Sequence, residues 1–153
     1  MKLDDAIQQN NFRSIQQKTY INLLYTYYWL TDKVKDIFKK FDITPQQYNV
    51  LRILRGSLPN PLSPIQIRER MLDKMSDTSR LVSRLEKKGL VVKNVSFNDK
   101  RFIDVLISEK GLELLKKMEI IENEIDNLFN GLTEQELEQL NQWLDKIKTC
   151  GLF

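Results

Sequence analysis

Three helix starts constrain the fold more than any other feature of this sequence. Each has Thr or Ser followed three positions later by Gln or Glu, and they lie at 44–47, 63–66 and 133–136. In such a capping box the hydroxyl accepts a hydrogen bond from the third helical N–H, and the Gln or Glu side chain bonds back to the capping residue. Proline follows the hydroxyl residue in the first two, at the helical position where its missing N–H costs nothing. The sequence therefore predicts a mainly helical chain.

A stripe of apolar residues at steps of three and four runs from Ile15 to Phe41 without an internal Gly or Pro. This spacing predicts one amphipathic helix, roughly 40 Å long at 1.5 Å per residue. Because such a helix exceeds what one small domain covers, part of its stripe is expected to meet a second copy of the chain. After Ser108 the same spacing predicts two more helices, one continuing to Gly131 and one beginning at the third capping box.

The middle of the chain predicts two short helices, a longer polar helix and a hairpin. The short helices are expected at about 45–55 and 64–72, separated by a turn rich in Gly and Pro. Ser76 is expected to cap the polar helix, which ends at the next glycine. Two β-branched strands follow, at 90–95 and 101–107. This order is that of a winged helix-turn-helix, so the predicted fold is mainly α with a small two-stranded β-wing and long N- and C-terminal helices.

Charge is distributed unevenly along the chain. Segment 70–101 has nine basic residues against four acidic ones, a net charge of +5, whereas 109–145 has three against ten, a net charge of −7. A basic segment in a chain whose total is only +3 is typical of a face that binds a polyanion such as DNA. A charge run is often just a solvated helix face, but here it coincides with the polar helix and the hairpin.

The chain has no histidine and a single cysteine, Cys150. This composition excludes zinc-finger ligand sets, His-based metal sites, His-containing catalytic triads and internal disulfides. The glycines are too scattered for a nucleotide-binding loop. We therefore expect no enzyme activity, no metal and no cofactor, and we interpret Cys150 as an inert terminal thiol. With no signal-peptide pattern and no long apolar run, the chain is expected to be cytoplasmic and not in a membrane.

Three stretches closely resemble the MarR family of bacterial transcriptional regulators: 75–91 (MSDTSRLVSRLEKKGLV), 98–101 (NDKR) and 105–111 (VLISEKG). The resemblance implies a homodimer that binds a pseudo-palindromic DNA duplex and acts as a repressor released by a small-molecule effector. It divides the chain into a dimerisation helix at 1–43, a DNA-binding winged helix-turn-helix at 44–107 and dimerisation helices at 108–153. The alternative is a winged helix that binds another protein and not DNA.

By position, the resemblance assigns DNA contacts to eight residues. Ser76, Thr78, Ser79 and Arg80, at the start of the polar helix, are expected at the major groove, and Arg84 follows one turn later. Ser63, at an earlier helix start, is expected to contact a phosphate. Lys100 and Arg101 are the two cations expected on the hairpin tip, at the minor groove or the adjoining phosphates.

Two carboxylates near these residues have separate interpretations. Asp99 resembles the family's wing aspartate, which orients an arginine of the recognition helix, here Arg84. Lys100 stands where relatives more often have arginine, which favours phosphate contact over base reading. Asp77 either caps the helix or accepts a hydrogen bond from a cytosine amino group, and the sequence leaves both open.

Aromatic residues of the N-terminal helix have two possible roles. Ordinary core and interface packing is one. The other is an effector pocket, similar to that of family members that bind small aromatic acids. The group is Tyr20, Tyr25, Tyr27, Tyr28 and Trp29, of which Tyr25, Tyr28 and Trp29 are the candidate contacts to a small aromatic or phenolic effector.

Overall fold

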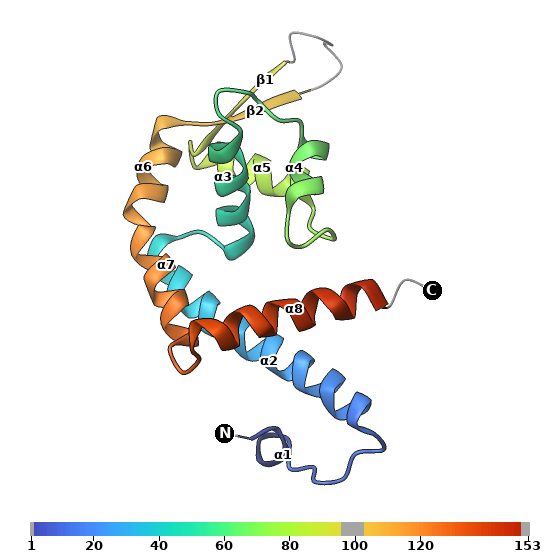
Figure 1. Ribbon diagram of the computed structural model, residues 1–153. Coiled ribbons are helices and arrows are strands. Elements are labelled where there is room, and N and C mark those ends of the chain that lie inside the picture. Colours follow the sequence, from blue (N-terminus) through green and yellow to red (C-terminus); the bar gives the residue numbers. More distant parts are fainter. Residues whose placement is uncertain (1, 96–102, 151–153) are drawn as a thin grey trace. The chain divides into compact units, whose positions relative to one another are not determined.

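The computed structural model describes residues 2–95 and 103–150 of the chain. It divides into two compact units, Met1–Met118 and Glu119–Phe153. Helices dominate both units, and the two described strands pair in the first unit as an antiparallel sheet (Figure 1), which confirms the predicted fold class. In chain order the elements are α1 (Leu3–Ala6), α2 (Ile15–Phe38), η1 (Lys39–Phe41), α3 (Pro45–Ser57), α4 (Pro64–Arg70), α5 (Thr78–Lys87), β1 (Val91–Val95), β2 (Ile103–Ile107), α6 (Glu109–Lys117), α7 (Glu119–Asp126), η2 (Asn127–Phe129) and α8 (Glu134–Cys150).

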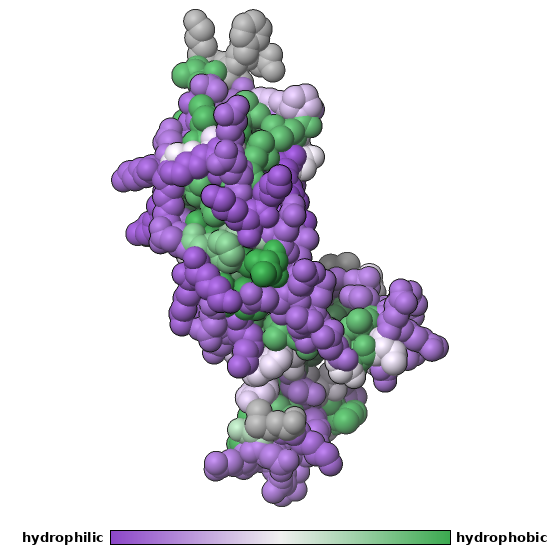
Figure 2. Space-filling view, turned by 90° about the vertical axis from the view of Figure 1, so that its left-hand side faces the viewer, coloured by the Kyte–Doolittle hydropathy of each residue, from purple (hydrophilic) through white to green (hydrophobic). Residues whose placement is uncertain are grey.

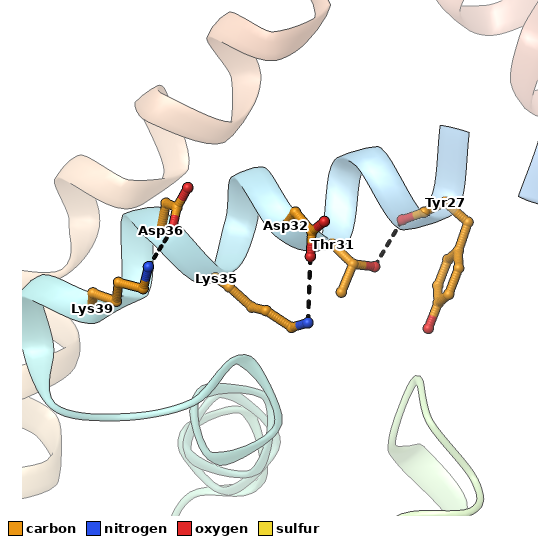
Figure 3. Close-up of polar contacts among 6 residues, drawn as sticks. All are labelled: Tyr27, Thr31, Asp32, Lys35, Asp36 and Lys39. Carbon is orange, nitrogen blue, oxygen red and sulfur yellow. Dashed lines mark hydrogen bonds and ion pairs between the residues drawn. The ribbon is translucent and has the colours of Figure 1, made fainter. Parts of the chain in front are cut away.

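The long N-terminal helix is confirmed as α2 with the 3₁₀ turn η1 at its end. It begins after Ser14, whose hydroxyl accepts a hydrogen bond from the third helical N–H at 3.1 Å. Ion pairs one turn apart lie along its second half, Asp32–Lys35 at 3.5 Å and Asp36–Lys39 at 2.6 Å (Figure 3). The hydrogen bond from the Lys39 ammonium holds the pKa of the Asp36 carboxyl below its ordinary value. These pairs mark a polar edge of the helix.

The first half of the apolar stripe of α2 is open to solvent in the single chain, and the second half is partly or fully covered. Phe38, near its end, is buried and packs edge-on against the Tyr48 ring of α3, with ring centroids 5.1 Å apart. None of the described helices, α2 included, is both long and apolar enough to span a membrane. Apolar groups stand between hydrophilic ones on the face shown in Figure 2. On α2 the exposed large side chains are Ile15, Tyr20, Leu23, Leu24, Tyr27, Tyr28 and Trp29.

Both capping boxes of the middle region are confirmed. At α3 the Thr44 hydroxyl accepts from the Gln47 N–H at 3.2 Å, and the Thr44 N–H donates to the Gln47 side chain at 3.0 Å. At α4 Ser63 and Gln66 make the same two bonds, at 3.3 and 2.8 Å. Because these bonds satisfy N–H groups that have no partner inside the helix, the helices start where the sequence predicts.

The core of the first unit lies among α3, α4, α5 and the sheet. Strands β1 and β2 pair with Val91 opposite Ile107. Val105 of β2 also exchanges two backbone hydrogen bonds with Leu62, at 2.9 and 3.1 Å, which ties the sheet to the residue before the α4 cap. The most buried side chains, each 0% or 1% exposed, include Val50, Leu51, Leu54, Ile67, Met71, Val82, Leu85 and Val105.

The prediction of one unbroken helix between Ser108 and Gly131 is wrong. Helix α6 ends at Lys117 because Met118 adopts φ −89° and ψ 1°, outside the helical range, and α7 starts at the next residue. Neither Gly nor Pro marks this break in the sequence. The apolar spacing continues across it, so periodicity alone carries no signal of where the two compact units divide.

The third capping box is confirmed in the C-terminal unit. The Thr133 N–H donates to the Glu136 carboxylate at 2.8 Å, and the Thr133 hydroxyl accepts from the Glu136 N–H at 3.3 Å. The backbone bond from Thr133 favours the charged carboxylate and lowers the pKa of Glu136. Helix α8 follows with every described residue at least partly exposed, Trp143 and Ile147 by 56% and 50%. Its leucines, Leu137, Leu140 and Leu144, are half-buried, whereas Trp143 and Ile147 are uncovered.

Candidate nucleic-acid interface

The start of α5 differs from the expected one. Asp77 is the capping residue, and its Oδ1 accepts from the Arg80 N–H at 3.0 Å. The capping interpretation of Asp77 is confirmed, and the expectation that Ser76 caps this helix is wrong. The Ser76 hydroxyl instead donates to Asp73 Oδ2 at 2.8 Å, in the turn before the helix. Asp73 also accepts from the Met75 N–H at 2.9 Å, so this carboxylate shapes the turn that leads into α5.

Thr78 faces inward. It is 5% exposed, and its hydroxyl lies 3.5 Å from the Met71 sulfur and 3.4 Å from the Ser76 carbonyl oxygen. The side chain is thus turned mostly to the core, while Thr78 also lines the hollow at the start of α5, and its DNA contact stays a prediction. The reason for the inward orientation is helical phase: Thr78, Val82 and Leu85 share the face of α5 that packs on the core.

Ser79, Arg80 and Arg84 project from the rest of the α5 surface, and all three are exposed. Arg84 follows Arg80 by about one turn, so the two guanidinium groups share an edge of the helix. Within the described part of the chain neither arginine forms an ion pair. Their charge is directed to solvent, where it can neutralise phosphates or donate to guanine.

A hollow of about 420 Å³ opens between the starts of α4 and α5. Ser63, the cap of α4, uses its hydroxyl oxygen to accept from the helix, which leaves the hydroxyl hydrogen available to a phosphate. The hollow brings Arg68 and Lys74 together with Ser79, and the sequence analysis assigned no contact to either cation. Extending the basic segment two residues toward the N-terminus would have included Arg68. The lining residues are Pro64, Ile65, Arg68, Lys74, Met75, Ser76, Asp77, Thr78 and Ser79.

The tip of the predicted wing, with Asp99, Lys100 and Arg101, lies outside the described residues. The orientation of an arginine by Asp99 and the DNA contacts of Lys100 and Arg101 stay predictions. The described part of the wing is joined to α5 by an ion pair that the sequence analysis missed, in which Lys93 Nζ lies 2.6 Å from Glu86 Oε2. One partner is in a helix and the other in a strand, so no spacing rule within one element pairs them.

The aromatic residues considered for an effector pocket lie on α2 between Tyr20 and Trp29 and point to more than one side of the helix. Tyr25 is half-buried, whereas Tyr28 and Trp29 are 63% and 39% exposed. Two described hollows lie elsewhere in this unit, around Asp42 and Lys88 where η1 leads into α3. The role of the aromatic residues stays a prediction.

Known proteins resemble this chain over most of its length. A family model described as MarR family matches residues 41–101, which include α3, α4, α5 and β1. The HTH-type transcriptional repressor IacR of Pseudomonas putida is 29% identical over 131 residues, which cover 80% of this chain and 77% of IacR. The segment 41–101 matched by the family model contains the residues of the candidate interface.

Solved structures share the fold. The crystal structure of a MarR transcription factor from Planctomyces limnophilus is 30% identical with a TM-score of 0.67, covering 88% of this chain and 98% of that one. The S. aureus MepR–DNA complex is 24% identical, with a TM-score of 0.75 and coverage of 86% and 96%. The organohalide-sensing RdhR-CbdbA1625 regulator, bound to 2,4-dichlorophenol, is 19% identical, with a TM-score of 0.80 and coverage of 94% and 88%.

Proposed function

The chain belongs to the MarR family of transcriptional regulators, and we propose on this basis that it represses transcription by binding a pseudo-palindromic DNA duplex. We assign DNA binding to 44–107 and dimerisation to 1–43 and 108–153. The observation that carries the proposal is the exposed edge of α5, where Arg80 and Arg84 project from a helix whose other face is core. That the MepR relative was solved in complex with DNA supports this use of the surface.

In the proposed complex the start of α5 enters the major groove, where Ser79 and Arg80 meet base edges and phosphates. Ser63 donates to a phosphate, and Ser76 joins it by exchanging its bond to Asp73 for one to the DNA backbone. Arg68 and Lys74 add positive charge near the same backbone. The predicted wing cations, Lys100 and Arg101, contact the adjoining phosphates or the minor groove.

A second copy of the chain binds the second half-site of the duplex. The exposed apolar side chains of α2 and α8, such as Tyr27 and Trp143, form the kind of surface that a homodimer buries. Two-fold symmetry then places two α5 helices in successive major grooves, about 34 Å apart.

Release from DNA follows from linkage. A ligand that prefers a dimer geometry with the wrong spacing weakens DNA binding by its differential affinity for the two geometries. We propose a small aromatic or phenolic effector, with Tyr25, Tyr28 and Trp29 as its candidate contacts. The 2,4-dichlorophenol-bound form of the RdhR-CbdbA1625 relative supports a phenolic ligand class.

The alternative function is a winged helix that binds another protein and not DNA. The exposed guanidinium groups of Arg80 and Arg84, which form no ion pair with another described residue, favour DNA, because neutralising phosphates with several cations strengthens binding to a polyanion. We propose no enzyme activity, since IacR is a transcriptional repressor. A repressor acts where the chromosome is, which in a bacterium is the cytoplasm.

Selection of bound fragments from a random pool of duplexes of about 30 base pairs, two half-sites long, tests the proposal. We expect the purified chain to enrich an inverted repeat.

Arg80→Ala should weaken binding to the selected duplex by about 1–3 kcal/mol if Arg80 contacts a base, or lower the slope of log affinity against log salt concentration by about one if it neutralises a phosphate. The matched control is Lys116→Ala, an exposed cation of α6. No enriched sequence, or an unchanged affinity and salt slope for Arg80→Ala, contradicts DNA binding and favours the alternative.

A further inference from the structure

The ion pair between Glu86 and Lys93 joins α5 to the first strand of the wing. The charged atoms are 2.6 Å apart, and the side chains are 41% and 25% exposed. Lys93 shares a face of β1 with Val91 and lies opposite Val105 of β2, and both valines are buried. The stem of Lys93 therefore leaves a buried part of the sheet, and its ammonium reaches out to the helix.

Beyond this pair the hairpin leaves the core. Val91 and Ile107 at its base are 3% and 7% exposed, whereas Val95 and Ile103 at the far end of the described strands are 64% and 44% exposed. A two-stranded hairpin has little stability of its own. Among the described residues the Glu86–Lys93 pair is the outermost polar contact between wing and α5. On the side of β1 this pair fixes the direction of the outer hairpin relative to α5, while the backbone bonds between Val105 and Leu62 hold β2 at the same level.

The charge of Glu86 is unfavourable for DNA binding taken alone. It lies in the basic segment 70–101 and follows Ser79 by two helical turns, on the side of α5 next to the proposed DNA contacts. A carboxylate in this place repels phosphates. Electrostatics alone therefore predicts that removing this charge strengthens DNA binding, whereas a positioning role predicts the opposite.

We propose that Glu86 and Lys93 are positioning residues that set the angle between the recognition helix and the wing, so that both meet one duplex. This rests on the proposed DNA-binding function. The pair holds β1 at its third residue, and Arg101, to which the resemblance assigns a DNA contact, lies in the sequence between β1 and β2. Without the pair the described strands can take more directions relative to α5, and docking the wing on DNA costs more conformational entropy.

Glu86→Gln is the decisive variant because it removes the charge and keeps the shape. We expect it to weaken binding to the selected duplex about fivefold, the effect of a half-exposed ion pair at the upper end of its usual range. Glu69→Gln is the matched control, an exposed acid of α4 whose carboxylate forms no ion pair within the described ranges. It should bind as well as the unaltered chain, or better. Circular dichroism checks that both proteins keep their helix content.

Two further measurements separate positioning from a general loss of folding. Reversing the pair, with Glu86→Lys and Lys93→Glu together, keeps the net charge and should recover most of the affinity that Lys93→Glu loses alone. Arg101→Ala should cost less affinity in the Glu86→Gln protein than in the unaltered one, because the wing contributes less there.

The outcomes distinguish this inference from the proposed function. An unaltered chain that selects no duplex overturns both. If the unaltered chain binds and Glu86→Gln binds equally well or more tightly, only the positioning role is overturned. Independent, additive effects of Glu86→Gln and Arg101→Ala overturn it as well, since they show that the pair does not act through the wing.

Discussion

In the winged helix-turn-helix region a core of apolar side chains is fully buried and cations point outward, whereas among the described residues of α2 and α8 Phe38 alone is buried. Leu51, Leu85 and Val105 are fully buried, while Tyr27 of α2 and Trp143 of α8 are 62% and 56% exposed. The first region forms its core within one chain, although some of its apolar side chains, such as Leu72 and Met75 at 90% and 92%, are exposed. The terminal helices do not, so their burial requires a partner surface.

This division suits a regulator in which the winged region contacts DNA and the terminal helices set the distance between the two DNA-binding regions of a dimer. A core that is complete in each copy keeps the shape of α5 constant. In the proposed dimer the contacts between copies would repack more easily than a core, so the proposed ligand could change the spacing between the two α5 helices while each winged region stays folded. Testing the contrast between the two regions therefore tests the function as well.

The largest expected effect is that of Leu51→Ala in the core of the winged region. Removing this fully buried side chain should lower the free energy of unfolding by about 2–5 kcal/mol. Leu24→Ala, on the part-exposed stripe of α2, is the matched variant. Urea titrations at several protein concentrations measure both. We expect the Leu24→Ala loss to depend on concentration, because that side chain is buried only in a dimer. Equal, concentration-independent losses would remove the distinction between the regions.

A smaller effect is expected when the apolar surfaces are charged. Tyr27→Asp and Trp143→Asp should each weaken self-association by about 2 kcal/mol or more if they lie near the centre of the interface. Sedimentation equilibrium at micromolar concentration measures the dissociation constant. The control is Asn22→Asp, an exposed residue on the other side of α2. An unaltered chain that is monomeric at this concentration would show that these surfaces serve a different partner.

The smallest effect concerns the cap of α8 and depends on pH. Folding lowers the pKa of Glu136 from its ordinary value of 4.5, because the Thr133 bonds favour the charged carboxylate. The carboxylate therefore stabilises the folded state at pH values above 4.5. This stabilisation is lost as the pH falls through the lower pKa of the folded state. Compared with Glu136→Gln, the unaltered chain should be more stable at pH 7, with the difference fading below pH 4.5. Urea titrations from pH 7 to about 3 test this, with Glu138→Gln as the control for charge loss. A difference that stays constant over this range would show that the lowered pKa has no role in stability.

Local chemistry explains which features were predictable. The capping boxes at Thr44, Ser63 and Thr133 are short-range hydrogen-bond patterns, and all three form as expected. At the start of α5 the same reasoning selected Ser76 when Asp77 caps the helix, because both residue types are good caps and a shift of one residue is below what local propensity resolves.

The sequence by itself determined the helical architecture, the winged order of elements and the basic charge of the middle segment, because capping, periodicity and charge are properties of neighbouring residues. Only the tertiary structure decided that Thr78 faces the core and that Glu86 meets Lys93. Packing sets the rotation of α5 about its axis, and that rotation, together with the path of β1, brings residues from different elements into contact.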